Sequence, residues 1–124
     1  MNRNSGYLLV KQGEPVPAEG GKRIEEFVGR VAGGEDRFSI AHMVAPPGWS
    51  EPAQNPQFDE ITLMLSGRKR VEVNGETLEL HPGEVLVVYR GSRVRYANPF
   101  PEPAVYWSIC LPAFAPHLAG REPE

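Results

Sequence analysis

The chain has 124 residues, enough for one domain with one hydrophobic core. Its 13 basic and 16 acidic side chains give a formal net charge of −3, and no basic run is longer than GRKR, so nucleic acid is not an expected partner. The single cysteine, Cys110, excludes an internal disulfide. No apolar run approaches the roughly 20 residues of a membrane span, and no leader resembles a signal peptide, so we expect a cytoplasmic protein without a membrane partner.

The first half of the chain predicts short strands separated by turns. Thirteen glycines and thirteen prolines favour an all-β protein over one with long helices. The apolar patch Tyr7–Val10 predicts an edge strand followed by a loop. Two β-rich stretches, 24–31 and 38–44, are joined by AGGED and predict a hairpin. The segment 45–57 contains four prolines and is expected to be a loop, because proline lacks the backbone donor of a central strand.

Six further segments of strand length follow, and turn sequences separate them. The segments are 60–65, 69–75, 76–80, 84–89, 93–98 and 104–111. This pattern predicts a closed or sandwiched antiparallel sheet. Asn74 and Gly75 are the strongest hairpin signal, since Asn-Gly readily adopts the positive φ angles of a type I′ turn. The tail after residue 111 is expected to hold at most one helical turn.

The spacing of particular glycines and polar residues follows two motifs. Gly48, Glu60 and Gly67 fit G-x5-H-x-H-x3,4-E-x6-G at its glycine, glutamate and final glycine. A second set fits the two glycines and the asparagine of G-x5-P-x-G-x2-H-x3-N: Gly83, Gly91 and Asn98. In these motifs the chain resembles the cupin family. The resemblance implies a single-domain jelly-roll barrel over residues 1–124, with its core at about 38–112.

The chain departs from the cupin pattern at the metal ligands. The three histidine positions of the motifs fall on Gln54, Pro56 and Val94, so Glu60 is the one family ligand that is kept. Proline and valine offer no side-chain donor and glutamine is a poor ligand, so we expect no metal at this place and no cofactor. FDEITLMLSG, GETLELHPGEVLVVYRGS and the final strand ending in LPA resemble the Q-type ethanolamine-utilisation cupins. That likeness implies a small-molecule ligand.

Strand alternation predicts which side chains enter the barrel. If Glu60 faces inward, Thr62 and Met64 do so too, and Tyr96 shares a face with Asn98. Facing strands would then form a pocket with a carboxylate, a hydroxyl, a phenol, an amide and apolar walls. The alternative is that Glu60 only accepts hydrogen bonds from neighbouring groups. The predicted ligand-binding residues are Glu60, Thr62, Met64, Gln54, Trp49, Tyr96 and Asn98.

Four residues are candidates for acid/base catalysis: Glu60, Glu51, Tyr96 and His42. Glu51 is either a second pocket carboxylate or a surface acid in a proline-rich loop. Two carboxylates in one cavity would repel each other, which raises one pKa and supplies an acid/base pair. His42 is either a general base or noncanonical metal ligand beside Glu60, or a hydrogen-bonded core or interface histidine.

These observations predict a small cupin that binds a small polar molecule. One hypothesis adds metal-independent acid/base activity of an isomerase, cyclase or lyase type. The alternatives are a metal-dependent enzyme with a site built from Glu60 with His42 or Glu51, and a binding module without turnover. We also expect a homodimer, because the apolar segment Gly6–Val10 could add to the sheet of a partner. The same segment could instead pair within its own chain.

Overall fold

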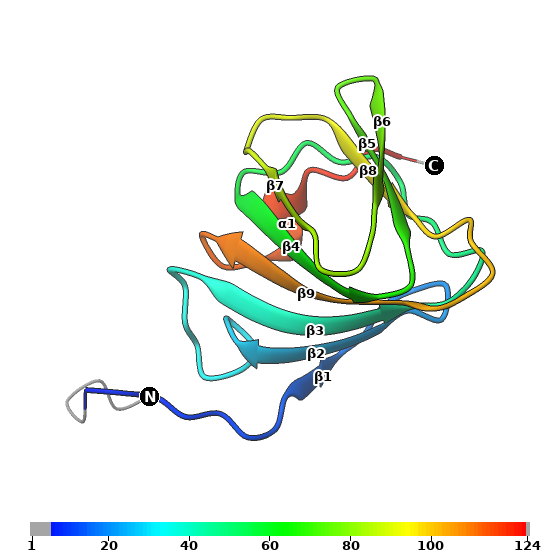
Figure 1. Ribbon diagram of the computed structural model, residues 1–124. Helices are drawn as coiled ribbons and strands as arrows, with labels where there is room; N and C mark the ends of the chain where they lie inside the picture. The colour runs from blue at the N-terminus through cyan, green and yellow to red at the C-terminus, as the bar shows by residue number, and fades with distance from the viewer. Residues whose placement is uncertain (1–5, 124) are drawn as a thin grey trace.

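The computed structural model describes residues 6–123 and shows an all-β, jelly-roll barrel (Figure 1). Nine strands and one short helix are present in that range: β1 (Glu14–Val16), β2 (Arg23–Val28), β3 (Ser39–Ala45), β4 (Asp59–Ser66), β5 (Lys69–Val73), β6 (Glu76–Leu80), β7 (Val85–Val88), β8 (Val94–Ala97), β9 (Ala104–Leu111) and α1 (Pro116–Ala119). The six-stranded sheet has the order β1-β2-β3-β9-β4-β7, and the three-stranded sheet has the order β6-β5-β8. The small sheet lies across the large one and the core fills the space between them (Figure 1).

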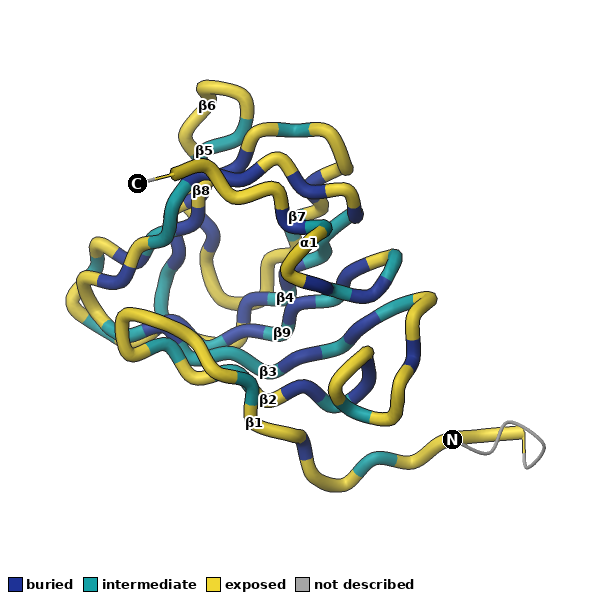
Figure 2. Tube along the Cα trace, turned by 180° about the vertical axis from the view of Figure 1, so that it is seen from behind, coloured by how far each residue is buried: buried dark blue, intermediate teal, exposed yellow. Residues whose placement is uncertain are grey.

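Strand β9 occupies the centre of the large sheet. It pairs antiparallel with β3 on one side and with β4 on the other. Its side chains alternate strictly, so Ala104, Tyr106, Ser108 and Cys110 are buried on the inner face. Figure 2 shows buried positions recurring along β9 and the strands beside it. The inner face of β9 therefore forms the floor of the barrel.

The predicted hairpins are present in the structure. The segments predicted at 24–31 and 38–44 form the paired strands β2 and β3. Strands β5 and β6 are joined through Asn74 and Gly75, whose φ angles are 49° and 85°. Positive φ at both residues is what a type I′ turn requires.

The edge strand predicted at Tyr7–Val10 was wrong. Those residues form no strand, and Tyr7 is 74% exposed. The edge is taken instead by β1, which pairs with Ile24–Glu26 of β2. Pro15 is tolerated there because an edge strand can turn its missing donor away from the ladder.

The tail of the chain folds back on the barrel. Helix α1 is a single turn, as the sequence predicts, and Ala119 is buried beside Phe58 and Cys110. No helix within residues 6–123 is long and apolar enough to cross a membrane.

Candidate functional site

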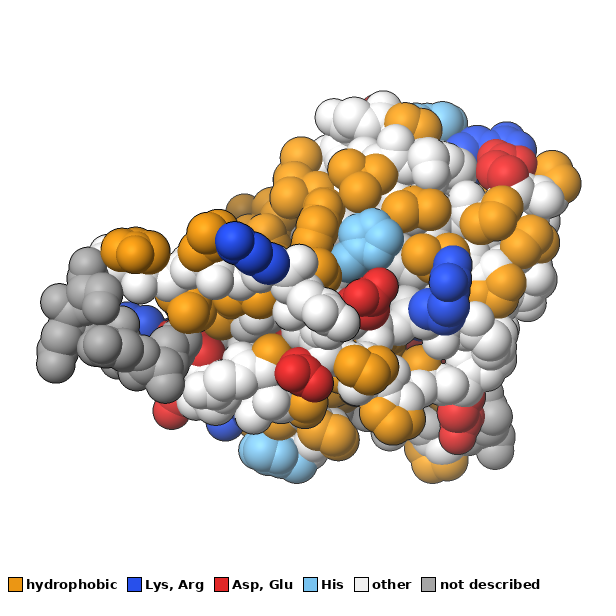
Figure 3. All heavy atoms as spheres, turned by 90° about the horizontal axis from the view of Figure 1, so that it is seen from below, with side chains coloured by type: hydrophobic (Ala, Val, Ile, Leu, Met, Phe, Trp, Pro, Cys, Tyr) orange, Lys and Arg blue, Asp and Glu red, His pale blue; other side chains and the backbone are white. Residues whose placement is uncertain are grey.

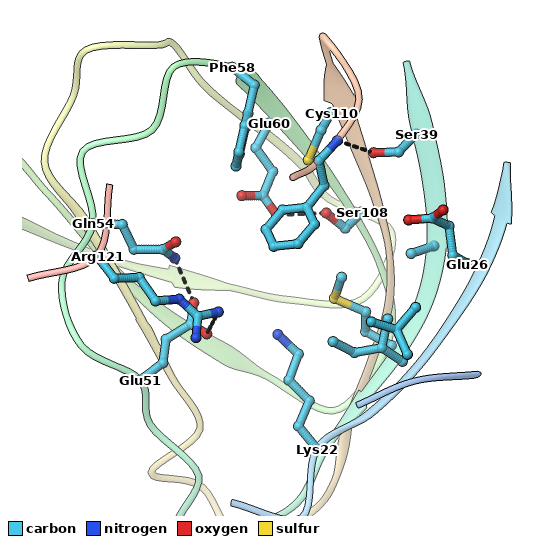
Figure 4. Close-up of a pocket in the computed structure, with 15 residues that line it drawn as sticks. Lys22, Glu26, Ser39, Glu51, Gln54, Phe58, Glu60, Ser108, Cys110 and Arg121 are labelled. Carbon is cyan, nitrogen blue, oxygen red and sulfur yellow. Dashed lines mark hydrogen bonds and ion pairs between the residues drawn. The ribbon is translucent and has the colours of Figure 1, made fainter. Parts of the chain in front are cut away.

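The inner face of the six-stranded sheet and the neighbouring loops enclose a cavity of about 60 Å³ at one end of the barrel. Side chains from β1, β2, β3, β4 and β9 line it, together with the loops before β2 and β4 and the C-terminal tail (Figure 4). A wider hollow of about 510 Å³ shares Lys22, Glu51 and Arg121 with this cavity and forms its mouth. One compact chamber thus connects to the surface through an entrance that carries the charged side chains of Lys22, Glu51 and Arg121.

Glu60 projects into the chamber from the start of β4 (Figure 4). The Tyr96 hydroxyl donates a hydrogen bond of 3.1 Å to Oε1, and the Ser108 hydroxyl donates one of 2.6 Å to Oε2. Tyr96 comes from β8 and Ser108 from β9, so both sheets hold the carboxylate. Strand alternation places Thr62 and Met64 on the same face of β4 as Glu60, and both of these side chains are buried.

Glu51 lines both the chamber and the mouth. Its side chain is 11% exposed, which excludes a freely solvated surface acid. The Gln54 amide donates to Oε1 at 2.7 Å, and the Arg121 guanidinium lies 3.6 Å from Oε2. Figure 4 shows Glu51, Gln54 and Arg121 facing Glu60 and Ser108 across the space. The cavity therefore contains two carboxylates, each already oriented by two neighbours.

Two lysines also belong to this end of the barrel, and the sequence motifs do not indicate either. Lys22 lines the chamber, and its ammonium lies 4.4 Å from the centre of the Trp49 ring. Lys69, the first residue of β5, is 1% exposed. Its ammonium lies 3.6 Å from the centre of the Tyr106 ring and 4.2 Å from that of Tyr96. These cation–π contacts stabilise buried ammonium groups by about 1 to 2 kcal/mol each.

Burial and mutual repulsion act on the protonation of these lysines. Burial, followed by the charge of Lys22, lowers the pKa of Lys69 from 10.5 to about 7, although Glu60 and Glu51 oppose the shift. Burial also lowers the pKa of Lys22, against the opposing fields of Glu51 and Glu60. Lys69 can therefore exchange a proton near neutral pH, which an ordinary lysine cannot do.

The phenols and the thiol of the site stay protonated. Burial and the charge of Glu60 raise the pKa of Tyr96 well above 10, so its hydroxyl remains a donor to Glu60. Burial also raises the pKa of Tyr106, whose hydroxyl is the single buried side-chain N or O atom in residues 6–123 without a hydrogen-bond partner. Burial and Glu60 likewise raise the pKa of the Cys110 thiol, which argues against a thiolate nucleophile.

Six of the predicted site residues do not line the chamber: Thr62, Met64, Tyr96, Trp49, Asn98 and His42. Trp49 lines the mouth. Asn98 is fully buried and bonds to the backbone: its amide donates to the carbonyls of Ala45 and Glu102 at 3.1 and 2.9 Å. His42 points to the outer face of the large sheet.

The position of His42 follows from its neighbours in β3. Ala41 and Met43 line the chamber, so alternation turns His42 away from it. Its ring meets Trp107 edge-on, with the ring centres 5.0 Å apart. The structure therefore does not bring His42 to Glu60.

The positions of the cupin metal ligands do not fit a metal. Gln54 and Val94 are adjacent, because each donates its backbone N–H to the carbonyl of the other at 2.8 Å. The Gln54 amide donates a hydrogen bond to Glu51, and the side chains of Pro56 and Val94 have no atom that could bind a metal. No group of three or more His, Cys, Asp or Glu side chains within residues 6–123 could hold a metal ion. The chemistry of the site is therefore derived from its own side chains.

A jelly-roll barrel with polar side chains converging inside one end defines a class of small β-barrel proteins with an internal pocket. Within that class, the family described as "Cupin domain" matches residues 41–111, more than half of the chain. The chain belongs to this family.

Comparisons with individual proteins agree on the fold. The chain is 46% identical over 120 residues to the protein named Endoribonuclease YbeY of Myxococcus xanthus, and this match covers 97% of the chain. It spans 41% of that relative, less than half of its length. A Streptomyces PAC13 structure with uridine has a TM-score of 0.72 at 14% identity, covering 92% of this chain and 87% of that one. The EutQ protein of Clostridium difficile has a TM-score of 0.61 at 16% identity, covering 74% and 63%.

Proposed function

We propose that this small cupin binds a small polar molecule in the chamber and moves a proton on it, with Glu60 as a metal-independent acid/base. The observation that carries the proposal is the position of Glu60. Its carboxylate lines the chamber and is fixed by Tyr96 at 3.1 Å and by Ser108 at 2.6 Å. A fixed carboxylate within reach of a bound ligand is what general base catalysis requires.

The hydrogen bonds to Glu60 leave it able to react. A carboxylate has about four lone-pair positions, and Tyr96 and Ser108 occupy one on each oxygen. The remaining positions can accept a proton from a substrate C–H or O–H group. Because the pKa of Tyr96 is raised, this neighbour stays protonated and continues to hold the carboxylate.

The lysines supply positive charge near the reacting group. Removal of a proton leaves negative charge on the substrate, and preorganised cations stabilise such charge strongly in a site sheltered from water. Burial lowers the pKa of both Lys22 and Lys69, and the charge of Glu60 opposes this for both, so both ammonium groups lie within the electrostatic reach of Glu60. This arrangement supports isomerisation, cyclisation or elimination, the reactions that begin with proton abstraction.

The test is solvent exchange on small probe molecules. Pyruvate and dihydroxyacetone, one anionic and one neutral, are incubated in D2O and the exchange of C–H for C–D is followed by NMR. The wild-type chain should accelerate exchange of at least one probe, and Glu60→Gln should reduce the rate by about a hundredfold or more. The control Glu76→Gln, at an exposed position on β6, should keep the wild-type rate.

Two outcomes would overturn this assignment. Equal exchange rates for the wild type and Glu60→Gln would remove Glu60 from the chemistry. Binding of the probes without any exchange would favour the binding module without turnover, a role compatible with carboxylates that are already hydrogen-bonded.

The other assignments are weaker. A metal enzyme built on Glu60 with His42 has no support, because His42 lies on the outer face against Trp107. RNA cleavage is not proposed, since the chain spans 41% of the Myxococcus protein and carries a net charge of −3. Membership of the Q-type ethanolamine-utilisation branch and a cytoplasmic location stay proposals that rest on the sequence motifs and on the single cysteine.

A further inference from the structure

Two ammonium groups at this end of the barrel lack acceptors among the described residues: that of Lys22, which lines the chamber, and that of Lys69, which does not line it. Within residues 6–123, neither makes a hydrogen bond or lies within 4.0 Å of a carboxylate oxygen. Their contacts are the faces of Trp49, Tyr96 and Tyr106. An ammonium has three N–H donors, and the faces of these rings leave those donors free for acceptors that a ligand brings.

The two pocket carboxylates do not satisfy these donors, because no oxygen of Glu60 or Glu51 lies within 4.0 Å of either ammonium nitrogen. Glu60 accepts from Tyr96 and Ser108, and Glu51 accepts from Gln54 and lies beside Arg121. The unsatisfied groups of the pocket are therefore cationic donors. The chemical complement of such a pocket is an anion with acceptor oxygens.

We propose that Lys22, supported by the charge of Lys69, binds the carboxylate of the ligand, so that the ligand is a small carboxylic acid. Lys22 is placed for direct contact, because it lines both the chamber and the mouth and its ammonium points into the space between Glu51 and Glu60 (Figure 4). Lys69 lies deeper, against Tyr106. Burial and then the charge of Lys22 lower the pKa of Lys69, and a carboxylate near Lys22 would offset the second of these effects.

The size of the chamber favours a small ligand. Its volume of about 60 Å³ is about four times the roughly 15 Å³ that one water molecule needs. That space accommodates a carboxylate and a few further atoms, and a longer ligand would extend into the mouth of about 510 Å³. With the carboxylate at Lys22, the adjoining carbon atoms would lie toward Glu60. This inference rests on the same pocket as the proposed function and adds the class of molecule that enters it.

The experiment is an NMR titration of the labelled chain at pH 7 and constant ionic strength. The probes are acetate, inorganic phosphate and the neutral isostere acetamide. Acetate should bind in the millimolar range typical of a four-atom ligand and shift signals around the chamber, and acetamide should not. Lys22→Gln should weaken acetate binding by about tenfold or more, since a charge-assisted hydrogen bond is lost.

Matched variants separate this site from general charge effects. The chain has three lysines, and Lys11→Gln at an exposed position removes the same charge and should leave acetate binding unchanged. Lys22→Arg keeps the charge and should retain most of the affinity, which guards against a folding defect in Lys22→Gln. Stronger binding of phosphate than of acetate would overturn the assignment to a carboxylate, and equal binding by Lys22→Gln would overturn the site.

Glu60→Gln distinguishes the failure of this inference from the failure of the proposed function. It should bind acetate as well as the wild type or better, because it removes a negative charge from the chamber. Acetate binding without proton exchange on pyruvate would leave the anion site standing and refute the acid/base role. Exchange on dihydroxyacetone without acetate binding would support the acid/base role of Glu60 and refute the anion site at Lys22.

Discussion

Replacing Lys69 with methionine should stabilise the chain, and the gain should depend on pH. Lys69 is 1% exposed and has no hydrogen bond or ion pair within residues 6–123. Methionine keeps most of the side-chain volume and removes the charge whose burial is costly. Both the size of the gain and its pH dependence follow from the difference between 10.5 and about 7 in the pKa of Lys69.

The sign of the pH dependence follows from proton binding. Between pH 7 and 10.5 the unfolded chain binds a proton at Lys69 that the folded chain does not, so wild-type stability rises with pH in this window. At about 1.4 kcal/mol for each pH unit, the penalty is about 5 kcal/mol at pH 6 and about 2 kcal/mol at pH 9. The cation–π contacts with Tyr96 and Tyr106 oppose this penalty, so 5 kcal/mol is an upper limit.

The measurement is urea unfolding of the wild type and Lys69→Met at pH 6 and pH 9. The excess stability of the variant should be largest at pH 6 and should fall by about 3 kcal/mol at pH 9. Lys11→Met, at an exposed position, should show no such change. The charged and titratable groups that act on Lys69 are Lys22, Glu60, Glu51 and Cys110. Their own titration is the main other contribution to the change in excess stability between pH 6 and pH 9. A difference that stays constant within about 0.5 kcal/mol between the two pH values would refute the shifted pKa.

Two further predictions concern the scaffold and the assembly. Asn98→Ala should lower the free energy of unfolding by about 2 to 4 kcal/mol, because it leaves the buried carbonyl of Ala45 and the part-buried backbone groups of Phe100 and Glu102 without their partner. The exposed control Asn55→Ala should cost less than about 0.5 kcal/mol in the same urea titration, and equal losses would contradict the role of Asn98. We also propose a homodimer that covers the hydrophobic side chains gathered on one face of the molecule (Figure 3). Light scattering at about 10 µM should then give a mass of about twice the 13.7 kDa of one chain, and the mass of a monomer would contradict this.

The sequence could predict the barrel because its signals are local and periodic. The Asn74-Gly75 turn, the alternation from Glu60 to Met64 and the spacing of the motif glycines each depend on a few neighbouring residues. The apolar character of Tyr7–Val10 predicts an edge strand there, whereas in the structure β2 pairs with Glu14–Val16. Pairing is a property of two segments, and one segment cannot reveal it.

The missed lysines show a different limit. Lys69 lies within the run GRKR, and such a run predicts a solvated surface because lysine is rarely buried. Strand alternation puts Lys69 on the same face as the fully buried Val71, and this was the available signal. Lys22 and Arg121 come from irregular segments at opposite ends of the chain, so no periodicity could have placed them beside Glu51.

The absence of metal ligands and the presence of buried lysines fit together as one electrostatic arrangement. A carboxylate in the interior needs a positive partner, and in a metal-binding cupin site the ion would supply it. Here Gln54, Pro56 and Val94 offer no ligand set, while Lys22 and Lys69 bring positive charge to the same end of the barrel as Glu60. Unlike a metal ion, an ammonium group can also give up a proton, and the pKa of Lys69 at about 7 makes this possible near neutral pH. This end of the barrel therefore contains a group that can accept a proton and another that can donate one, which is the minimum that an acid/base reaction without a metal requires.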